Sequence, residues 1–344
     1  MGEQVMRSRR YAAIVTCAIA ALALMIVSRY CGVKKQYMRL EGVQWTTDYH
    51  ITYEASHPLN DSVQRVFSLV DSCASVFNPK SLVTALNQNK TNRVDSLIAR
   101  MYNTALTVNK ATRGAYDPTV MPLVNAWGFG FKSGRLPTQR DLDSLLAFVG
   151  LEKTRLHGLT LIKDNPNVQF DFSSIAKGLA CDEIARMLER NGVVNYMVEI
   201  GGEIACRGVN AQGKPWHVSV DLPLDESTAA SHKSALTVQL DKGGVATSGN
   251  YRKYKEVQGK RVSHIVNPKT GQSEESDLLS VTVVAPDCMS ADAWATGCMV
   301  MGTERTKKLL EGNSQLGVMT ISADKEGNFV VWSNRRFAQL MPQP

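Results

Sequence analysis

The sequence predicts an α+β protein, a single compact unit of mixed helices and antiparallel strands preceded by an N-terminal membrane segment. Helical periodicity dominates the chain up to Gly192 and short alternating strands dominate after it. Neither a Pro/Gly linker nor a fixed-period repeat separates the two regions. Apolar residues make up 44% of the 344 residues and charged residues 21%, as in an ordinary folded protein.

An apolar run over residues 11–27 follows a group of arginines at the N-terminus. This pattern is typical of an export signal or a single membrane anchor, and the alternative is a buried core helix. No A-x-A site follows the run. We therefore expect an uncleaved anchor in residues 1–32 and a domain over 33–344 on the periplasmic face of the inner membrane. Lipid modification of Cys31 is the weaker alternative.

Apolar spacing predicts the elements in order. Alternation indicates a strand over Tyr49–Tyr53. Helices are expected over Val63–Val70 behind an Asp61 cap, over Val94–Val108, from Thr138 to Val149, and from Ser173–Ser174 to Leu188, with Gly192 after its end. Further strands are expected over Met197–Ile200, Trp216–Val220, Leu236–Leu240, Leu279–Ala285, Val318–Ile321 and Phe329–Trp332, with a helix over Ser290–Met301 capped by Ser290.

Charge and cysteine usage exclude several functions. The net charge of +7 includes no dense basic stripe with interleaved aromatic residues, so a nucleic-acid partner is not expected. The seven cysteines form no C-x-x-C pair, which excludes a zinc ribbon and a thioredoxin-type motif.

Two polar clusters suit a phosphate and a cation. Asp171 to Gly178 places a carboxylate, two hydroxyls and Lys177 at a helix start, where free N–H groups favour an anion. Simple capping by Ser173 and Ser174 is the alternative. Asp292 and Thr296 are four residues apart, so both oxygens project from one helix face and suit Mg²⁺. A solvated first-turn aspartate is the alternative there.

Two further segments suit a ligand with a planar ring. Gly243 to Tyr251 contains Thr247 and Ser248 among glycines, which allow close backbone approach. His264 precedes a turn over 268–271 and is either a general base or a hydrogen-bonded strand histidine. Ala126-Trp127-Gly128, after Asp117-Pro118-Thr119, offers an aromatic side chain that either holds a ring or belongs to a loop core.

Taken together and in order, these segments resemble the ApbE family of flavin transferases. The motifs that carry the resemblance are Asp117-Pro118-Thr119, Ala126 to Gly130, Asp171 to Gly178, Glu199 to Ile204, Thr247 to Tyr251, His264 to Gly271 and Ala291 to Thr296. Phe77-Asn78 is similar to an early family segment. Trp45-Thr46-Thr47 stands where the family usually has Met-Gly-Thr, a departure that retains the threonine.

The resemblance implies an enzyme that moves FMN from FAD to a threonine of an acceptor protein with release of AMP and the help of Mg²⁺. The implied metal ligands are the Ser174 carbonyl, the Asp292 carboxylate and the Thr296 hydroxyl. The implied FAD-binding residues are Trp45, Phe77, Ala126, Trp127, Gly128, Asp171, Lys177, Thr247, Ser248 and Ile265. His264 is the expected base and Asp292 the reserve. The expected acceptor is a subunit of a membrane redox complex.

Three other functions remain open at this point. The same pocket suits an FAD pyrophosphatase that uses water in place of threonine, or a non-catalytic FAD-binding lipoprotein. Ser174 to Lys177 also matches S-x-x-K, Ser248 to Asn250 resembles S-D-N, and Lys269 to Gly271 matches K-T-G. These are the motifs of penicillin-interacting serine acyl enzymes, although a K-T-G motif belongs on a strand and here follows Pro268 in a predicted turn.

Overall fold

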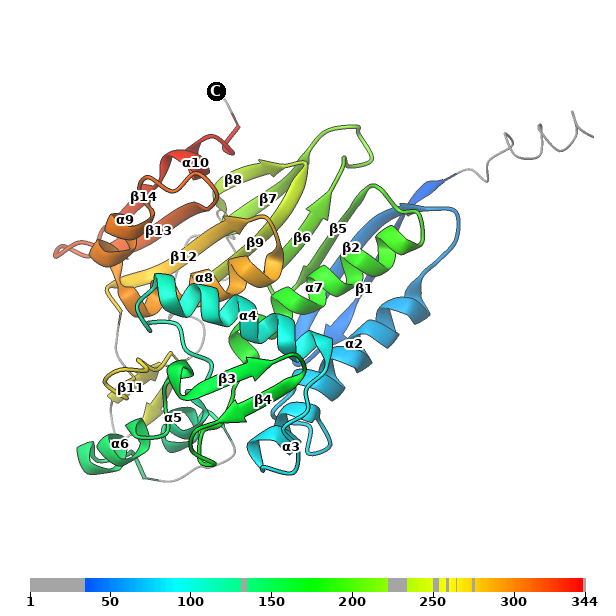
Figure 1. Cartoon of the computed structure of the whole chain (residues 1–344). Helices are drawn as coiled ribbons and strands as arrows, with labels where there is room; N and C mark the ends of the chain where they lie inside the picture. Colours follow the sequence, from blue (N-terminus) through cyan, green and yellow to red (C-terminus); the bar gives the residue numbers. More distant parts are fainter. Residues whose placement is uncertain are drawn as a thin grey trace, which may run out of the picture.

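The computed structural model describes residues 35–130, 135–221, 234–249, 254–257, 260–263, 265–273 and 276–342 (Figure 1). The predicted anchor over residues 11–27 and Cys31 lie outside these ranges. Within them, no helix combines the length and the apolar character that a membrane span requires.

One eight-stranded antiparallel sheet forms the centre of the domain (Figure 1). Its strands lie in the order β1-β2-β5-β6-β9-β12-β13-β14, so β1 and β14 are its edges. The strands are β1 (Gln36–Gln44), β2 (Thr47–Ala55), β5 (Tyr196–Ile200), β6 (Glu203–Arg207), β9 (Lys242–Gly249), β12 (Leu278–Ala285), β13 (Gly317–Ala323) and β14 (Phe329–Ser333).

Three two-stranded sheets accompany the main sheet. They are formed by β3 (Thr154–His157) with β4 (Thr160–Lys163), β7 (Trp216–Asp221) with β8 (Ser234–Leu240), and β10 (Tyr254–Val257) with β11 (Lys260–Ser263).

Helices α7 (Ser173–Arg190) and α8 (Cys288–Met301) lie against one face of the main sheet (Figure 1), and α10 (Arg335–Ala338) packs into the core on its other face. The helices are α2 (Asn60–Ala74), α3 (Leu82–Asn87), α4 (Ser96–Ala111), α5 (Met121–Ala126), α6 (Gln139–Leu146), η1 (Leu151–Lys153), α7 (Ser173–Arg190), α8 (Cys288–Met301), α9 (Thr303–Leu310) and α10 (Arg335–Ala338).

The alternation of side chains along the strands produces apolar packing on both faces of the main sheet. Tyr49, Ile51 and Tyr53 of β2 are buried on the face that packs against α2 and α7. Ile204, Val245 and Val284 face the other side, where they pack with Trp216 of β7 and Phe337 of α10. The main sheet is therefore packed on both faces, and α7 and α8 lie on one of them.

Glycines let α7 and α8 approach each other and the sheet closely. A Cβ at Gly178 would lie 2.5 Å from the Cys288 carbonyl oxygen, and one at Gly244 would lie 2.2 Å from the Cys288 backbone nitrogen. No larger residue fits at either position without backbone movement. The crossing of α7 over the start of α8 is thus fixed by the absence of side chains.

The predicted mixture of helices and antiparallel strands is confirmed, but three predicted caps are wrong. Asp61 lies in the first turn of α2, whose N-cap is Leu59. The cap of α8 is Asp287, which accepts a hydrogen bond from the Ser290 backbone N–H. Capping of α7 by Ser173 and Ser174 is also wrong, since the N-cap is Phe172 and makes no side-chain cap bond. Thr138 does cap α6, in a capping box with Asp141.

Candidate functional site

A hydrogen bond between Gly178 and Asp292 joins the first turns of α7 to the second turn of α8. The Asp292 carboxylate, 4% exposed, accepts this bond from the Gly178 backbone N–H at 3.1 Å. In an α-helix that same N–H points at the carbonyl of the residue four positions earlier, which is Ser174. The bond therefore places the Asp292 carboxylate beside the first turns of α7, the helix that begins with Ser173 and Ser174. The structure thus brings Asp292 to the helix turn that contains Ser174.

The third predicted ligand, Thr296, lies one turn further along α8. Its Oγ1 is 3.5 Å from Oγ of Ser248, near the end of β9. The neighbouring Thr247 bonds to Thr282 across the β9–β12 pair at 2.9 Å. The segment Gly243 to Tyr251, for which we expected close backbone approach to a ligand, belongs as far as Gly249 to strand β9, whose end brings Ser248 beside Thr296.

Lys177 forms an ion pair with Glu203 at the start of β6. The Glu203 side chain is only 4% exposed, whereas that of Lys177 is 30% exposed. Burial alone would lower the pKa of Lys177, but the Glu203 and Asp292 carboxylates outweigh it and raise that pKa. The ammonium predicted to contact FAD thus stays charged, and it already has a carboxylate partner.

The buried carboxylates resist ionisation in the protein without ligands. Burial, followed by the nearby Glu203 charge, raises the pKa of Asp292 to about 8. Burial also raises the pKa of Glu203, against the opposing effect of Lys177. Two carboxylates therefore share one ammonium in a site from which water is largely excluded. A bound cation would stabilise the ionised form of both carboxylates.

The hydroxyl of Ser174 is hydrogen-bonded to the buried side chain of Tyr116. Ser174 Oγ donates to Tyr116 Oη at 3.2 Å, and burial raises the pKa of that phenol. A Cβ at Gly297 of α8 would lie 3.1 Å from the Tyr116 Cβ, so Tyr116 packs between α7 and α8. The Ser174 hydroxyl is therefore occupied by a protein partner, which is consistent with a role for its backbone carbonyl.

The loop after Tyr116 is anchored by the buried carboxylate of Asp117. This carboxylate accepts bonds from the Thr119 backbone N–H at 2.8 Å and the Leu151 backbone N–H at 2.8 Å. The Asp171 backbone N–H donates to Pro118 O at 2.7 Å, and Asp171 Oδ1 accepts from the Ser173 N–H at 2.8 Å. The predicted residue Asp171 thus joins this loop to the start of α7.

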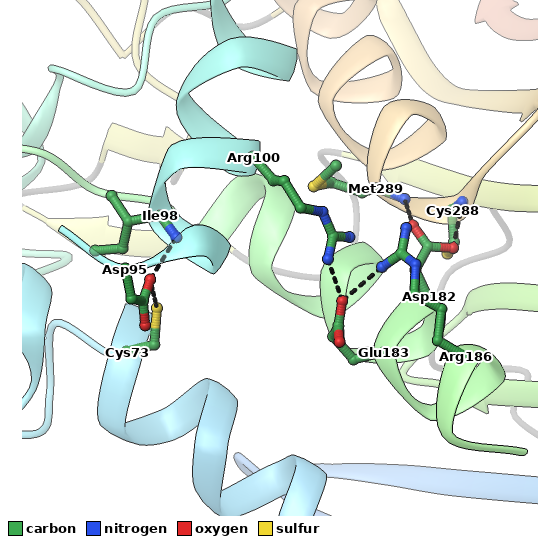
Figure 2. Close-up of polar contacts among 9 residues, drawn as sticks. All are labelled: Cys73, Asp95, Ile98, Arg100, Asp182, Glu183, Arg186, Cys288 and Met289. Atoms are coloured by element: carbon green, nitrogen blue, oxygen red, sulfur yellow. Dashed lines mark hydrogen bonds and ion pairs between the residues drawn. The ribbon is translucent and has the colours of Figure 1, made fainter. Parts of the chain in front are cut away.

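Polar contacts among α4, α7 and α8 fix the crossing (Figure 2). Asp182 of α7 accepts hydrogen bonds from the backbone N–H groups of Cys288 and Met289, both at 2.9 Å. Burial, and then the charge of Asp287, raise the pKa of Asp182 to about 7. The Asp182 carboxylate therefore satisfies two backbone N–H groups in the first turn of α8. The sequence pattern did not single out Asp182.

Figure 2 also shows how α4 is tied to α7 and α2. Glu183 of α7 pairs with both Arg100 of α4 and Arg186. Asp95 caps α4 by accepting from the Ile98 N–H at 2.8 Å, and it also accepts from Cys73 Sγ of α2 at 3.4 Å. Burial is the main reason that the pKa of Cys73 rises. These contacts hold α4 against α7 and α2, and α7 is one of the two helices that carry the site.

The segments that carry the predicted flavin contacts Trp45 and Phe77 are joined through Asp71. Asp71 of α2 accepts from Trp45 Nε1 at 3.2 Å and from Asn78 Nδ2 at 2.7 Å, so it links the β1–β2 turn to the loop that holds Phe77. Trp45 packs edge-on against Phe67, whereas Phe77 is 64% exposed. The indole is therefore held by protein contacts, and the Phe77 side chain is accessible.

The predicted segment Ala126-Trp127-Gly128 ends α5 and contacts the turn after Ile265. Trp127 Nε1 donates to the Gly271 carbonyl at 2.7 Å. Ile265 packs partly buried against the main core. The end of α5 is thus joined to the turn at residues 268–271, a short distance along the chain from Ile265.

His264, the predicted base, lies outside the described residues, as do Asn250 and Tyr251. No three His, Cys, Asp or Glu side chains in the described ranges form a metal-binding group. The predicted metal ligands include only one such side chain, that of Asp292. The other two ligand oxygens are the Ser174 carbonyl and the Thr296 hydroxyl. Two surface hollows, of about 350 and 310 Å³, are lined by neither Asp292 nor Thr296.

Comparisons with known proteins agree with the resemblance in the sequence. The model of the ApbE family matches residues 45–320. The FAD:protein FMN transferase of Escherichia coli is 34% identical over 301 residues, covering 85% of this chain and 84% of the relative. The FAD:protein FMN transferase of Vibrio cholerae serotype O1 is 35% identical over 317 residues, covering 89% and 94%. The solved structure of the flavin transferase ApbE from Vibrio cholerae aligns with a TM-score of 0.79 at 33% identity, over 89% of this chain and 100% of that chain.

Proposed function

Because this chain belongs to the ApbE family, we propose that it is a FAD:protein FMN transferase that moves FMN from FAD to a threonine of an acceptor protein and releases AMP. We further propose that the reaction requires Mg²⁺. The observation that carries this proposal is the hydrogen bond from Gly178 to Asp292, which brings the Asp292 carboxylate to the first turns of the helix that contains Ser174.

The residues present fit a magnesium ion. Mg²⁺ prefers oxygen ligands and usually keeps several positions for water and phosphate. Asp292 would supply a carboxylate oxygen, Ser174 its carbonyl oxygen and Thr296 its hydroxyl. Asp292 is 4% exposed and lies beside the equally buried Glu203, on a helix face that also carries Thr296, so the donor set is oxygen-only and includes a buried carboxylate. When bound, the ion would neutralise diphosphate charge and polarise the phosphorus under attack.

The chain's own residues would bind and orient the dinucleotide. The exposed ring of Phe77 and the indole of Trp45 offer surfaces for the flavin. The start of α7 would present its positive dipole end to the diphosphate, although the N–H groups of Ser173, Ile175 and Ala176 already donate to Asp171 or Phe172. Asp171, Lys177, Thr247, Ser248, Ile265 and the segment Ala126-Trp127-Gly128 complete the proposed FAD-binding set.

The transfer is a substitution at the phosphorus on the FMN side. The acceptor threonine oxygen forms a bond to this phosphorus while the bridging bond to AMP breaks, and AMP leaves with the bridging oxygen. The threonine proton passes to a base, for which His264 is our proposal. Asp292 is a poorer base, because binding a metal occupies its carboxylate.

Two related activities share this geometry. Hydrolysis of FAD to FMN and AMP would use water in place of threonine, and a non-catalytic binder would leave FAD intact. The serine acyl enzyme is disfavoured, because Ser174 Oγ donates to Tyr116, Lys177 pairs with Glu203, and Lys269 lies in an exposed turn. These contacts do not resemble a serine nucleophile activated by lysine.

We propose that the anchor over residues 11–27 holds the domain on the periplasmic face of the inner membrane. A membrane redox complex that carries flavin on threonine would then be the acceptor. Fractionation and protease protection of cells that express the full chain would test this location, and a protease-resistant cytoplasmic protein would overturn it.

Incubation with FAD, Mg²⁺ and a periplasmic redox subunit tests the activity itself. Flavin fluorescence that remains on the acceptor after denaturation supports the transferase. Release of free FMN alone would identify a hydrolase, and unchanged FAD would identify a binder.

A further inference from the structure

Three charged side chains from three elements meet beside the proposed metal ligands. Lys177 belongs to α7, Glu203 begins β6 and Asp292 lies in α8. Glu203 and Asp292 are 3% and 4% exposed, so both carboxylates are removed from water. The Lys177 ammonium pairs with Glu203, and its charge also acts on Asp292.

The charge of Lys177 acts on two carboxylates, those of Glu203 and Asp292, but Lys177 forms an ion pair with only one of them. It directly precedes Gly178, whose N–H binds Asp292, and its charge acts on Asp292 as well as on Glu203. The ion pair in the structure is nevertheless with Glu203. An ammonium that loses this partner would gain most by moving to the other carboxylate, because an unpaired buried charge is costly.

The backbone around Glu203 keeps its carboxylate in place. The Glu203 carbonyl accepts from Cys181 Sγ of α7 at 3.2 Å, and Glu203 pairs with Ile200 across the β5–β6 hairpin. Gly201 and Gly202 in the hairpin turn have φ values of 62° and 100°, a region that favours glycine. Glu203 thus reaches Lys177 from a fixed position.

We propose that Glu203 is a positioning residue that holds the Lys177 ammonium away from Asp292 and so keeps the Asp292 carboxylate free for the divalent cation. This inference rests on the proposed function, since it concerns the same metal site. Glu203 itself is not a metal ligand in this scheme. Its effect on the cation passes through Lys177.

The test is Mn²⁺ binding to the full-length protein in detergent with FAD present, measured by the loss of the free Mn²⁺ EPR signal. Glu203→Gln removes the charge but keeps the shape, so Lys177 should pair with Asp292 and weaken Mn²⁺ binding by about tenfold. In the double variant Glu203→Gln/Lys177→Met the competitor is gone, and Mn²⁺ affinity should return to that of Lys177→Met alone. A purely structural role of Glu203 would show no such rescue.

Glu304→Gln is the control, because Glu304 lies on the surface of α9 and pairs with Lys307 instead of Lys177. It should leave Mn²⁺ affinity unchanged. Lys177→Met provides a second variant should Glu203→Gln not fold, and at FAD concentrations that saturate each variant it should bind Mn²⁺ at least as tightly as the wild type, because the proposed FAD contact of Lys177 then does not enter the comparison. Circular dichroism confirms folding of each variant.

The outcomes separate the two proposals. Wild-type protein that binds no Mn²⁺ overturns the metal site of the proposed function. Wild-type binding that Glu203→Gln leaves unchanged overturns the role of Glu203 alone. Weakened binding without rescue in the double variant overturns competition by Lys177, as does weaker binding in Lys177→Met.

Discussion

The carboxylate of Asp292 accepts a hydrogen bond from the backbone N–H of Gly178, a residue 114 positions earlier in the chain. This bond joins the helix that contains Ser174 to the helix that contains Asp292 and Thr296. The proposed magnesium site depends on this contact, and the following predictions test its parts.

Asp292→Asn should abolish metal-dependent transfer while leaving the fold intact. The amide keeps the size of the side chain but removes the charge that a cation requires, so the transfer rate should fall by at least about a hundredfold. Flavin fluorescence on the acceptor measures the rate, and thermal unfolding checks the fold. Asp143→Asn on the exposed face of α6 is the control. Full transfer by Asp292→Asn would remove the metal assignment.

Ser174→Ala should leave metal affinity close to that of the wild type. The proposed ligand is the backbone carbonyl, which alanine retains, whereas the hydroxyl donates to Tyr116. Loss of that bond should lower the free energy of unfolding by about 1 kcal/mol. Calorimetric titration with Mg²⁺ and urea unfolding measure the two effects. A collapse of affinity with normal stability would show that the hydroxyl is the ligand.

Thr296→Val and Thr296→Ser should differ in metal binding. Valine matches the shape of threonine but lacks the hydroxyl, so Mg²⁺ affinity should fall by roughly 10–100-fold. Serine retains the hydroxyl and should bind nearly normally. The same titration compares the two variants, and equal affinities would exclude Thr296 as a ligand.

Gly178→Ala should separate α7 from α8. The new Cβ would lie 2.5 Å from the Cys288 carbonyl, a backbone atom that cannot rotate away. We expect a loss of about 1–3 kcal/mol in the free energy of unfolding, with weakened metal binding. Gly312→Ala is the control, since a Cβ there meets nothing within 4 Å. Equal unfolding of both variants would contradict the close crossing.

Lys177→Ala tests whether this lysine contacts FAD. As a contact to the diphosphate, Lys177 should contribute to FAD affinity more than to turnover, so its removal should raise the dissociation constant of FAD. Quenching of flavin fluorescence measures that constant. An unchanged constant would leave Lys177 with its Glu203 pairing alone.

Local periodicity was sufficient to predict the fold class and most of the long elements. Val63 to Val70 and Val94 to Val108 repeat at helical spacing, and both segments are helical. The edge strand Gln36–Gln44 was not predicted, because it has one solvent-facing side and little apolar alternation. Short elements such as α3 and α10 also carry too few apolar positions for a periodic pattern.

The site was predictable in its residue types but not in its contacts. Asp292 and Thr296 share a helix face by spacing alone, whereas their approach to Ser174 depends on Gly178 and on the long-range pairing of Asp182 with Cys288 and Met289. The role of Glu203 depends on the β5–β6 hairpin, which the sequence pattern did not reveal. A glutamate directly after two glycines was the available signal.

A crystal of the protein soaked with FAD and Mn²⁺ tests the central claim most directly. We expect one anomalous peak within coordination distance of the Ser174 carbonyl, an Asp292 carboxylate oxygen and the Thr296 hydroxyl, with the FAD diphosphate against it. That distance is about 2.1 Å for the magnesium that Mn²⁺ replaces. Bound FAD with no peak there, or with a peak at other ligands, would contradict this expectation.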